Sequence, residues 1–463
     1  MRSTNCRGQT SRLSRRQWLA RAAATSTLMA AAQFIPRRAF GASERIQLGF
    51  IGCKNRGMQN LEGFGIIGRQ AGQWPVDAAA LCDVDAKVLA ATARTVEKVA
   101  RAPSTFGDWR RMLERKDLDA VVISVPDHWH ALMTIEACRA GKDVYCEKPL
   151  TLTIDEGKVI GDAVKKYQRV FQVGTQQRSE FDRRFLKAVA LCRSGRLGKK
   201  LKARVQTGGA PSGGPFQETE PPKELDWEMY CGQAPKVPFC KERIGWNFRW
   251  WLEYSGGQVT DWGVHHMDIA LWALGGDETG PATIEGKGDF PRGVWKNVHP
   301  VQFLNGQVPL GPSYNVTPSY ECEIKLPNGN EITFTSNGGN DLILAGENGT
   351  IHVNRDRIEG APLADVEKSE TDRKWLDAEV EKLYRGMPIQ GHMANFFHCV
   401  KNRLKPISDV WTHVNSVNVC HMANIAMLLK KPLRWDAKRY MFADPEAQAL
   451  VKRTQRKGYE TKV

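Results

Sequence analysis

Short apolar runs and helix-like stretches alternate along the first third of the chain. Helical patterning covers residues 86–100 and 131–140, and apolar runs that predict strands lie at residues 46–51, 76–81, 120–125, 143–146 and 170–173. Strands that are regularly separated by helices are typical of a parallel, doubly wound sheet. We therefore predict an α/β fold whose first domain spans residues 43–170.

The pattern changes after about residue 175. Residues 208–222 form a loop rich in glycine and proline, and tryptophans are frequent between 246 and 262. Alternating segments joined by a Pro-Asn-Gly-Asn turn predict a hairpin, and helical patterns return further on; these segments are residues 320–326, 331–335, 392–401 and 414–429. We expect a second, α+β domain over residues 171–463.

Composition and charge narrow the class of protein. With 41% hydrophobic and 25% charged residues, the chain is not a disordered, collagen-like or coiled-coil protein. The net charge of +15 suggests a nucleic-acid binder, but residues 1–42 hold eight arginines and no acid, which leaves +7 for the remainder. No Lys/Arg block with interleaved aromatic residues follows, so we expect no nucleic-acid partner.

The N-terminus resembles a twin-arginine (Tat) export signal. Arg15 and Arg16 precede the apolar pair Trp18-Leu19, and a weakly apolar run spans residues 22–35. That run is shorter than the ~20 residues that cross a bilayer, so we expect no stable membrane anchor. The resemblance implies a signal over residues 1–42, cleavage near residues 39–42, the Tat machinery as a partner, and a periplasmic location; the alternative is a basic N-terminal arm.

The eleven cysteines of an exported protein that folds before transport need not pair. Most of them lie in apolar runs, where cysteine behaves as a small hydrophobic residue. Cys231 and Cys240 are close enough in sequence to bridge a loop. Cys-x-x-Cys and Cys/His finger spacings are absent from the sequence, so a structural zinc site is unsupported and we predict no metal.

A glycine-containing turn directly follows the first predicted strand. Gly52 and Gly57 take the outer positions of G-x-G-x-x-G, the pattern of a Rossmann dinucleotide-binding turn. Lys54 stands at the middle position, so Lys54 or Asn55 must accommodate or contact the phosphates. In isolation the same pattern also fits a plain loop.

An acid closes the next predicted strand. Asp83 stands where a carboxylate hydrogen-bonds the adenosine ribose, and a carboxylate there repels a 2'-phosphate. We therefore expect NAD rather than NADP, with Asp85 as a second candidate contributor. The alternative is a solvated aspartate at a strand end.

Two further strand ends carry polar clusters, at residues 126–130 and 147–149. Ligands of doubly wound sheets bind at the carboxyl ends of strands, where these clusters are expected. Lys148 is the most informative residue, because desolvation and like charge ease loss of its proton, and it can then relay a proton during hydride transfer.

The segment 261–268 offers a third cluster. If it opens a helix, Asp261, His265 and Asp268 fall on one face at i, i+4 and i+7. A histidine so placed can accept a hydroxyl proton while a carboxylate orients it. The same spacing fits a metal site, or a helix cap beside a core histidine.

Together these motifs resemble the Gfo/Idh/MocA family of NAD(P)-dependent oxidoreductases. Glu147-Lys148-Pro149 matches its E-K-P motif, Pro126 and His130 fit its P-N-x-x-H turn with Asp127 in place of Asn, and Asp261 and His265 match a D-x-x-x-H pair. The resemblance implies catalysis by Lys148, His265 and Asp261, with His265 transferring the proton at the substrate hydroxyl. It also implies a large open-faced mixed sheet in the second domain and a homo-oligomer, either dimer or tetramer. The candidate cofactor contacts are Gly52, Lys54, Asn55, Arg56, Gly57, Asp83, Pro126, His130, Glu147 and Lys148.

Substrate contacts are sought where family members line the sugar site. A tryptophan can present a flat apolar face to a sugar ring, although a tryptophan is more often simply buried. The candidates are Trp129, Gln176, Arg178, Arg249, Trp262 and His266.

We expect hydride transfer between NAD and a secondary carbon of a sugar, sugar derivative or cyclitol. Because free NAD is scarce outside the cytoplasm, an exported enzyme would hold NAD tightly and regenerate it in place. The alternatives are a glycosidase or epimerase that oxidises the sugar transiently, a metalloenzyme, and a non-catalytic NAD- or sugar-binding protein. The family's Tat-exported glycosidase branch has a Tyr-containing run where this chain has Val259-Thr260-Asp261.

Overall fold

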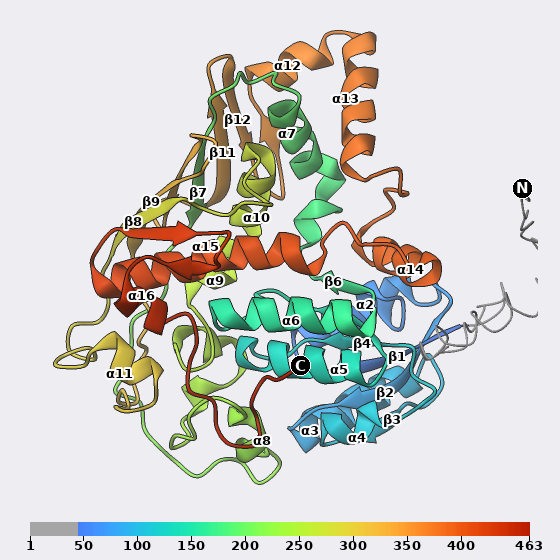
Figure 1. Cartoon of the computed structure of the whole chain (residues 1–463). Helices are drawn as coiled ribbons and strands as arrows, with labels where there is room; N and C mark the ends of the chain where they lie inside the picture. The colour runs from blue at the N-terminus through green and yellow to red at the C-terminus, as the bar shows by residue number, and fades with distance from the viewer. Residues whose placement is uncertain (1–44) are drawn as a thin grey trace, which may run out of the picture. The chain divides into compact units, whose positions relative to one another are not determined.

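The first sheet has six parallel strands in the order β3-β2-β1-β4-β5-β6, which confirms the predicted doubly wound fold (Figure 1). Its strands are β1 (Ile46–Ile51), β2 (Val76–Cys82), β3 (Ser104–Phe106), β4 (Ala120–Ile123), β5 (Asp143–Cys146) and β6 (Phe171–Val173). The strand order reverses between β1 and β4, and this switch point is where such sheets bind ligands. The computed structural model describes residues 45–463, so the predicted export signal and Cys6 lie outside the described residues.

Helices separate these strands, as the sequence predicts. They are α2 (Arg56–Gly63), α3 (Ala86–Glu97), α4 (Trp109–Leu113), α5 (His130–Arg139) and α6 (Ile154–Tyr167). Asp85 fixes the start of α3 because its carboxylate accepts from two backbone N–H groups of the first turn. Thr153 and Glu156 form a capping box at the start of α6.

The second sheet has nine strands in the order β13-β12-β11-β7-β10-β9-β8-β14-β15. It is mixed, because β7 (Lys202–Thr207) pairs parallel with β10 and antiparallel with β11. The other strands are β8 (Thr283–Gly288), β9 (Tyr320–Lys325), β10 (Glu331–Thr335), β11 (Asn340–Gly346), β12 (Gly349–Val353), β13 (Ile358–Glu359), β14 (Leu433–Asp436) and β15 (Met441–Phe442). Strands β9 and β10 form the hairpin that the sequence predicts.

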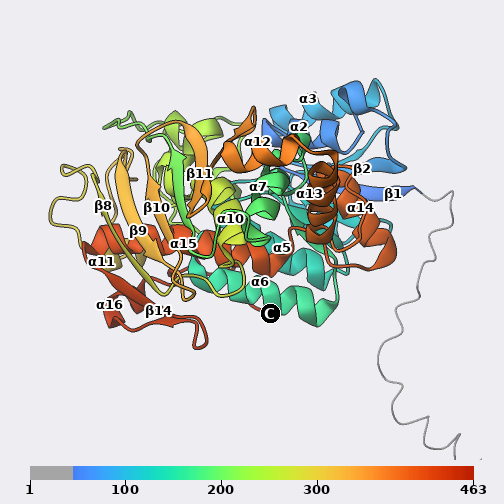
Figure 2. The ribbon, with the colours of Figure 1, turned by 90° about the horizontal axis from the view of Figure 1, so that it is seen from above.

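One face of this second sheet is open. Along β9, residues alternate between buried and exposed, with Cys322 and Ile324 buried and Glu321 and Glu323 exposed. Helices α7, α10 and α15 pack against the buried face (Figure 2). The open-faced mixed sheet predicted for the second domain is therefore present.

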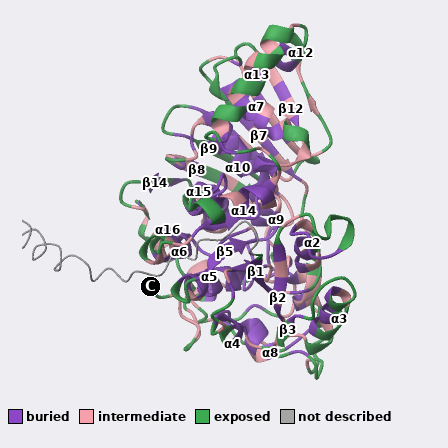
Figure 3. Ribbon diagram, turned by 90° about the vertical axis from the view of Figure 1, so that its right-hand side faces the viewer, coloured by how far each residue is buried: buried purple, intermediate pink, exposed green. Residues whose placement is uncertain are grey.

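The helices of the second half are α7 (Arg184–Arg193), α8 (Trp227–Cys231), α9 (Gln258–Asp261), α10 (Gly263–Leu274), α11 (Pro300–Leu304), α12 (Ala361–Glu367), α13 (Glu370–Leu383), α14 (His392–Asn402), α15 (Val410–Leu429) and α16 (Pro445–Ala449). Helix α15 begins four residues before the predicted start because Asp409 caps it. All residues of α10 are buried, and α15 packs against both α10 and α6 (Figure 3).

The hydrophobic core crosses the predicted domain boundary. One continuous cluster includes Leu48 and Tyr145 from the first sheet together with Leu271 and Phe334 from the second half. Residues 45–463 accordingly form one compact unit, and the boundary near residue 170 stays a prediction. No helix in this part of the chain combines the length and apolarity needed to cross a membrane.

Cys231 and Cys240, which are close enough in sequence to bridge a loop, do not pair. Both thiols are buried and free, as are the other eight cysteines of residues 45–463. The cysteines act as small apolar core residues, which is the role that their apolar surroundings predict.

Candidate functional site

A cavity of about 420 Å³ opens at the carboxyl ends of the first sheet's strands. Gly52, Asp83, Ser124 and Glu147, which line it, follow β1, β2, β4 and β5 respectively. Residues from the second half, Trp246 and His265 among others, close the other side. The volume lies in the range of ligand pockets, and the place is the switch point of a doubly wound sheet.

Two glycines make the turn after β1 possible. Gly52 has φ +84°, and a Cβ there would lie 2.3 Å from the carbonyl oxygen of Ser124. A Cβ on Gly57 would lie 2.0 Å from the carbonyl oxygen of Gly52. Both positions therefore demand glycine, as the dinucleotide-binding pattern requires.

Lys54 and Asn55, the predicted phosphate contacts, are exposed and line the cavity. Asn55 has φ +47° and immediately precedes α2. Arg56 also lines the cavity, but its Nε lies 2.8 Å from Oε1 of Glu147. Lys54, which stands where the pattern normally has a glycine, forms no ion pair with the residues that the structure describes, so the turn presents a cation to the cavity.

Asp83 lines the cavity at the end of β2. Its carboxylate accepts hydrogen bonds from the backbone N–H groups of Cys53 (2.8 Å) and Asp85 (2.9 Å), and burial raises its pKa. The carboxylate is therefore held in place between the glycine turn and the start of α3, where a ribose hydroxyl is expected. Asp85 also lines the cavity, while its own carboxylate caps α3.

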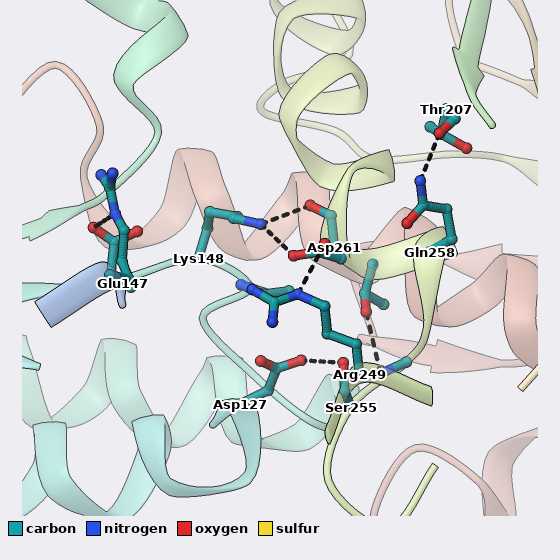
Figure 4. Close-up of polar contacts among 12 residues, drawn as sticks. Asp127, Glu147, Lys148, Thr207, Arg249, Ser255, Gln258 and Asp261 are labelled. Carbon is teal, nitrogen blue, oxygen red and sulfur yellow. Dashed lines mark hydrogen bonds and ion pairs between the residues drawn. The ribbon is translucent and has the colours of Figure 1, made fainter. Parts of the chain in front are cut away.

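Lys148 projects toward Asp261 across the cavity (Figure 4). Its Nζ lies 2.6 Å from Oδ1 of Asp261 and 2.9 Å from the Asp261 carbonyl oxygen. Burial lowers the pKa of Lys148 from its ordinary 10.5, and the charge of Asp261 opposes only part of that effect. Lys148 is therefore closer to its neutral form at pH 7 than an exposed lysine.

Asp261 holds a second cation. Its Oδ2 lies 3.0 Å from Nε of Arg249, whose guanidinium stacks on Trp246. Burial alone would raise the pKa of Asp261, but the charges of Lys148 and Arg249 outweigh burial and lower the pKa to about 2. Asp261 stays ionised and holds Lys148 and Arg249 together.

His265 also lines the cavity, but Asp261 does not orient it, because both carboxylate oxygens of Asp261 contact cations. Helix α9 ends at Asp261 and α10 begins at Gly263, so the two residues do not share one uninterrupted helix. Burial, followed by the charges of Lys148 and Arg355, lowers the pKa of His265 well below 6.5. His265 is neutral, and its buried Nδ1 has no hydrogen-bond partner among the described residues.

Asp268 and Arg178 lie away from the cavity. Nε and Nη2 of Arg178 contact the Asp268 carboxylate at 2.6 and 3.0 Å, and the guanidinium stacks on Trp272 at 4.3 Å. Both side chains of this ion pair are 1% exposed. The structure therefore does not bring Arg178 to the substrate site or Asp268 to the face of Asp261 and His265, and no cluster of potential metal ligands occurs in residues 45–463.

His130 is a predicted cofactor contact that does not line the cavity. Its Nδ1 lies 2.6 Å from the carbonyl oxygen of Pro149, and burial lowers its pKa to about 4. The histidine therefore supports the turn that carries Lys148. Pro126, from the same motif, does line the cavity.

Most of the remaining substrate candidates line the cavity, and one does not. Trp129, Gln176, Arg249 and Trp262 line the cavity, whereas His266 does not. His266 is fully buried, with its ring stacked on Trp262.

Sequence reasoning missed Arg355 and Trp246, both of which line the cavity. Arg355 lies in the turn between β12 and β13, far along the chain from every motif.

Asp127, in place of the usual Asn, is buried beside Lys148. Ser255 Oγ lies 2.5 Å from Oδ2 of Asp127, and burial raises the pKa of Asp127 to about 7. Asp127 is therefore a second group, beside Lys148, that can gain or lose a proton near neutral pH.

The curated relatives match parts of the chain. A glycosyl hydrolase family 109 protein of Shewanella putrefaciens is 32% identical over 161 residues, which cover 34% of this chain and 33% of that protein. The levoglucosan dehydrogenase of Pseudarthrobacter phenanthrenivorans is 28% identical over 294 residues, covering 58% of this chain and 65% of that enzyme. The chain thus aligns with between a third and two thirds of these relatives' lengths.

The fold agrees with solved structures over most of the chain. The WlbA dehydrogenase of Chromobacterium violaceum, solved with NADH and UDP-GlcNAcA, superposes with a TM-score of 0.58 at 17% identity, covering 86% of this chain and 97% of that one. Two family profiles match residues 46–175 ("Oxidoreductase family, NAD-binding Rossmann fold") and residues 213–293 and 295–461 ("Oxidoreductase family, C-terminal alpha/beta domain"). The chain therefore belongs to the Gfo/Idh/MocA oxidoreductase family and carries its NAD-binding Rossmann domain.

Proposed function

We propose that the protein is an NAD-dependent oxidoreductase that acts on a secondary hydroxyl or keto carbon of a sugar, sugar derivative or cyclitol. The observation that carries this proposal is a buried lysine with a lowered pKa, Lys148, in the same cavity as the dinucleotide-binding turn. The similarity to levoglucosan dehydrogenase supports the substrate class.

The residues present fit NAD. Gly52 and Gly57 permit the tight turn after β1 and its close packing, Lys54 and Asn55 offer polar contacts to a pyrophosphate, and Asp83 offers a carboxylate to a ribose. When bound, NAD supplies the site that accepts or donates the hydride.

Lys148, rather than His265, acts as the general base for oxidation, because burial lowers the pKa of His265 well below 6.5 and makes it the weaker base. In its neutral form, Nζ accepts the proton of the substrate hydroxyl; in the reverse direction the ammonium returns it. Asp261 positions the amine of Lys148 through the contact of 2.6 Å. Glu147, the residue before Lys148, is held by its ion pair with Arg56. His265, neutral and with a free Nδ1, accepts or donates a hydrogen bond at the same substrate.

The direct test is Lys148→Met, which keeps the length of the side chain and removes the amine. We expect turnover to fall by about a hundredfold or more while NAD binding stays intact, measured by steady-state kinetics and calorimetry. Lys158→Met is the matched control, because Lys158 is exposed on α6 and, within residues 45–463, its ion pair is with Asp162. Undiminished turnover of Lys148→Met contradicts the proposal, and a wild-type protein that binds NAD and sugars without turnover supports a binding protein.

A second candidate is a glycosidase or epimerase that oxidises the sugar transiently. The similarity to a glycosyl hydrolase family 109 protein favours it, and the same lysine would serve the oxidation step. NAD released from the denatured protein distinguishes the candidates. About one NAD per chain, with no need for added cofactor, supports a redox-neutral reaction, whereas an empty protein that needs added NAD supports an ordinary dehydrogenase.

We also propose export by the Tat pathway to the periplasm. The paired Arg15-Arg16 before Trp18-Leu19 supports it, and so do the free, buried cysteines, since the described fold needs no oxidative pairing. Replacing both arginines by lysine is expected to retain the protein in the cytoplasm, as measured by cell fractionation and immunoblotting. Unchanged periplasmic delivery would contradict the proposal.

The open face of the second sheet supports a homo-oligomer, dimer or tetramer. Exposed charges of both signs lie on it, such as Lys202 and Glu323, and can pair across an interface between two copies. Light scattering coupled to gel filtration measures the mass, and a monomer at micromolar concentration would contradict this expectation.

A further inference from the structure

While Lys148 is protonated, the end of the cavity around Lys148 and Asp261, where the substrate is expected, holds more positive than negative charge. Arg56 is paired with Glu147, while Lys148 and Arg249 share one carboxylate, that of Asp261. Asp127 adds at most one negative charge, because burial raises its pKa to about 7. The three cations and two carboxylates of these ion pairs, taken alone, leave one surplus positive charge.

Arg355 adds a further cation to this end. It lies above Trp262 at 4.5 Å and above Phe181 at 4.9 Å, and it lines the cavity. Its only polar contact to a side chain is Nη2 to Oε1 of Gln177 at 3.4 Å, and its buried Nε has no hydrogen-bond partner among the described residues. Within residues 45–463 it contacts no carboxylate, unlike Arg56 and Arg249.

The position of Arg355 points to the substrate rather than to the cofactor. It stacks on Trp262, three residues before His265, and its charge lowers the pKa of His265. The phosphates of NAD are expected instead at the turn of Lys54 and Asn55, which has its own exposed cation in Lys54. A guanidinium without a partner in a cavity favours a planar anion, because its N–H groups match two oxygens at once.

We propose that Arg355 binds a carboxylate of the substrate, so that the enzyme acts on a sugar acid in preference to the corresponding neutral sugar. This rests on the proposed oxidoreductase function and specifies its substrate class. The surplus positive charge would also attract such an anion into the cavity, and the attraction would weaken as salt is added.

The test compares matched pairs of ligands in the presence of saturating NAD. D-Glucuronate and D-glucose, D-galacturonate and D-galactose, and D-gluconate and D-sorbitol each differ by one carboxylate. We expect at least one acid to bind wild-type protein about tenfold or more tightly than its neutral partner by calorimetry. Arg355→Gln is expected to abolish this preference, and Arg355→Lys to restore only part of it.

Arg357→Gln is the matched control, since it removes the same charge two residues away, on an exposed side chain that pairs with Glu359. It should leave both the preference and NAD affinity unchanged. The proposal is overturned if no acid in the panel binds wild-type protein more tightly than its neutral partner. It is also overturned if Arg355→Gln weakens NAD and leaves the preference intact, because Arg355 would then bind the cofactor's pyrophosphate.

The outcomes distinguish the proposed role of Arg355 from the proposed oxidoreductase function. Lysine-dependent turnover of a neutral sugar by wild-type protein, with no preference for acids, keeps the oxidoreductase and rejects the role of Arg355. Loss of the acid preference in Arg355→Gln without any NAD-linked turnover in wild-type protein keeps the anion site and rejects the oxidoreductase.

Discussion

Two buried ion pairs of this protein use the same chemistry for different ends. Lys148 and Asp261 meet at 2.6 Å, and so do Arg178 and Asp268. The first pair lines the cavity, with 12% of the lysine side chain exposed, whereas both members of the second are 1% exposed. Access to the cavity, and not the type of pair, separates the lysine that we propose to be reactive from the arginine of the core pair.

The two aspartates differ in what surrounds them. Asp261 ends α9 at the cavity, while Asp268 lies within α10 and also accepts a hydrogen bond from Ser416 of α15 at 2.9 Å. Arg178 is further covered by Trp272. The second pair therefore joins three segments of the core, and the first leaves its lysine available to a ligand.

Breaking the core pair should have the largest effect on stability. Arg178→Met leaves Asp268 charged and buried without its partner, and we expect the free energy of unfolding to fall by about 3–5 kcal/mol. Urea denaturation measures this loss, and kcat per folded molecule should stay near wild type. Lys148→Met should give the opposite result, a large fall in kcat with the free energy of unfolding near that of wild type. If Arg178→Met abolishes turnover in fully folded protein, the distinction between the pairs fails.

Two adjacent histidines allow the same comparison on a smaller scale. His265 lines the cavity and His266 does not. His265→Gln should lower kcat by about ten- to a hundredfold with little change in Tm, because it alters a group in the site. His266→Gln should instead lower stability by about 1–2 kcal/mol and leave kcat nearly unchanged. Equal effects of the two variants on kcat would contradict the assignment.

The pH dependence of turnover reports the charge of Asp261. In the proposed reaction neutral Lys148 accepts the proton, so the rate of oxidation should rise with pH as the lysine deprotonates. Asp261→Asn removes the charge that favours the ammonium while burial remains, so the rising limb should move to lower pH by about one unit. Asp268→Asn is the control and should leave the limb in place. A shift to higher pH in Asp261→Asn would refute this account.

An exposed cation should give the smallest effect. Lys54→Ala is expected to weaken NAD binding only about two- to fivefold, because the charge lies in water and its interactions are screened. Calorimetry at two salt concentrations should show a weaker salt dependence for the variant. A loss of NAD affinity well above fivefold would contradict this expectation and would mean that Lys54 is buried when NAD is bound.

The first sheet could be predicted from sequence because its strands are short apolar runs bounded by turns. The exception is β3, Ser104–Phe106, whose three residues carry no distinctive pattern. The chemistry at the strand ends followed from the topology, since parallel strands place Gly52, Asp83 and Lys148 at one edge.

Residues outside the motifs could not be placed in this way. Helical spacing put Asp261 and Asp268 on one face, but the helix is interrupted at Trp262. Arg178 follows β6 as a site residue would, yet its side chain turns to the core to meet Asp268. Arg355 reaches the cavity only through the pairing of β12 and β13, which no local pattern announces.

The free thiols have a practical consequence. Every cysteine of residues 45–463 is buried and unpaired, so a thiol reagent can react only when the surrounding structure opens. The extent of labelling over time would therefore measure local opening throughout the fold without an engineered probe. Mass spectrometry of the labelled peptides would report separately on the glycine turn, through Cys53, and on the open-faced sheet, through Cys322.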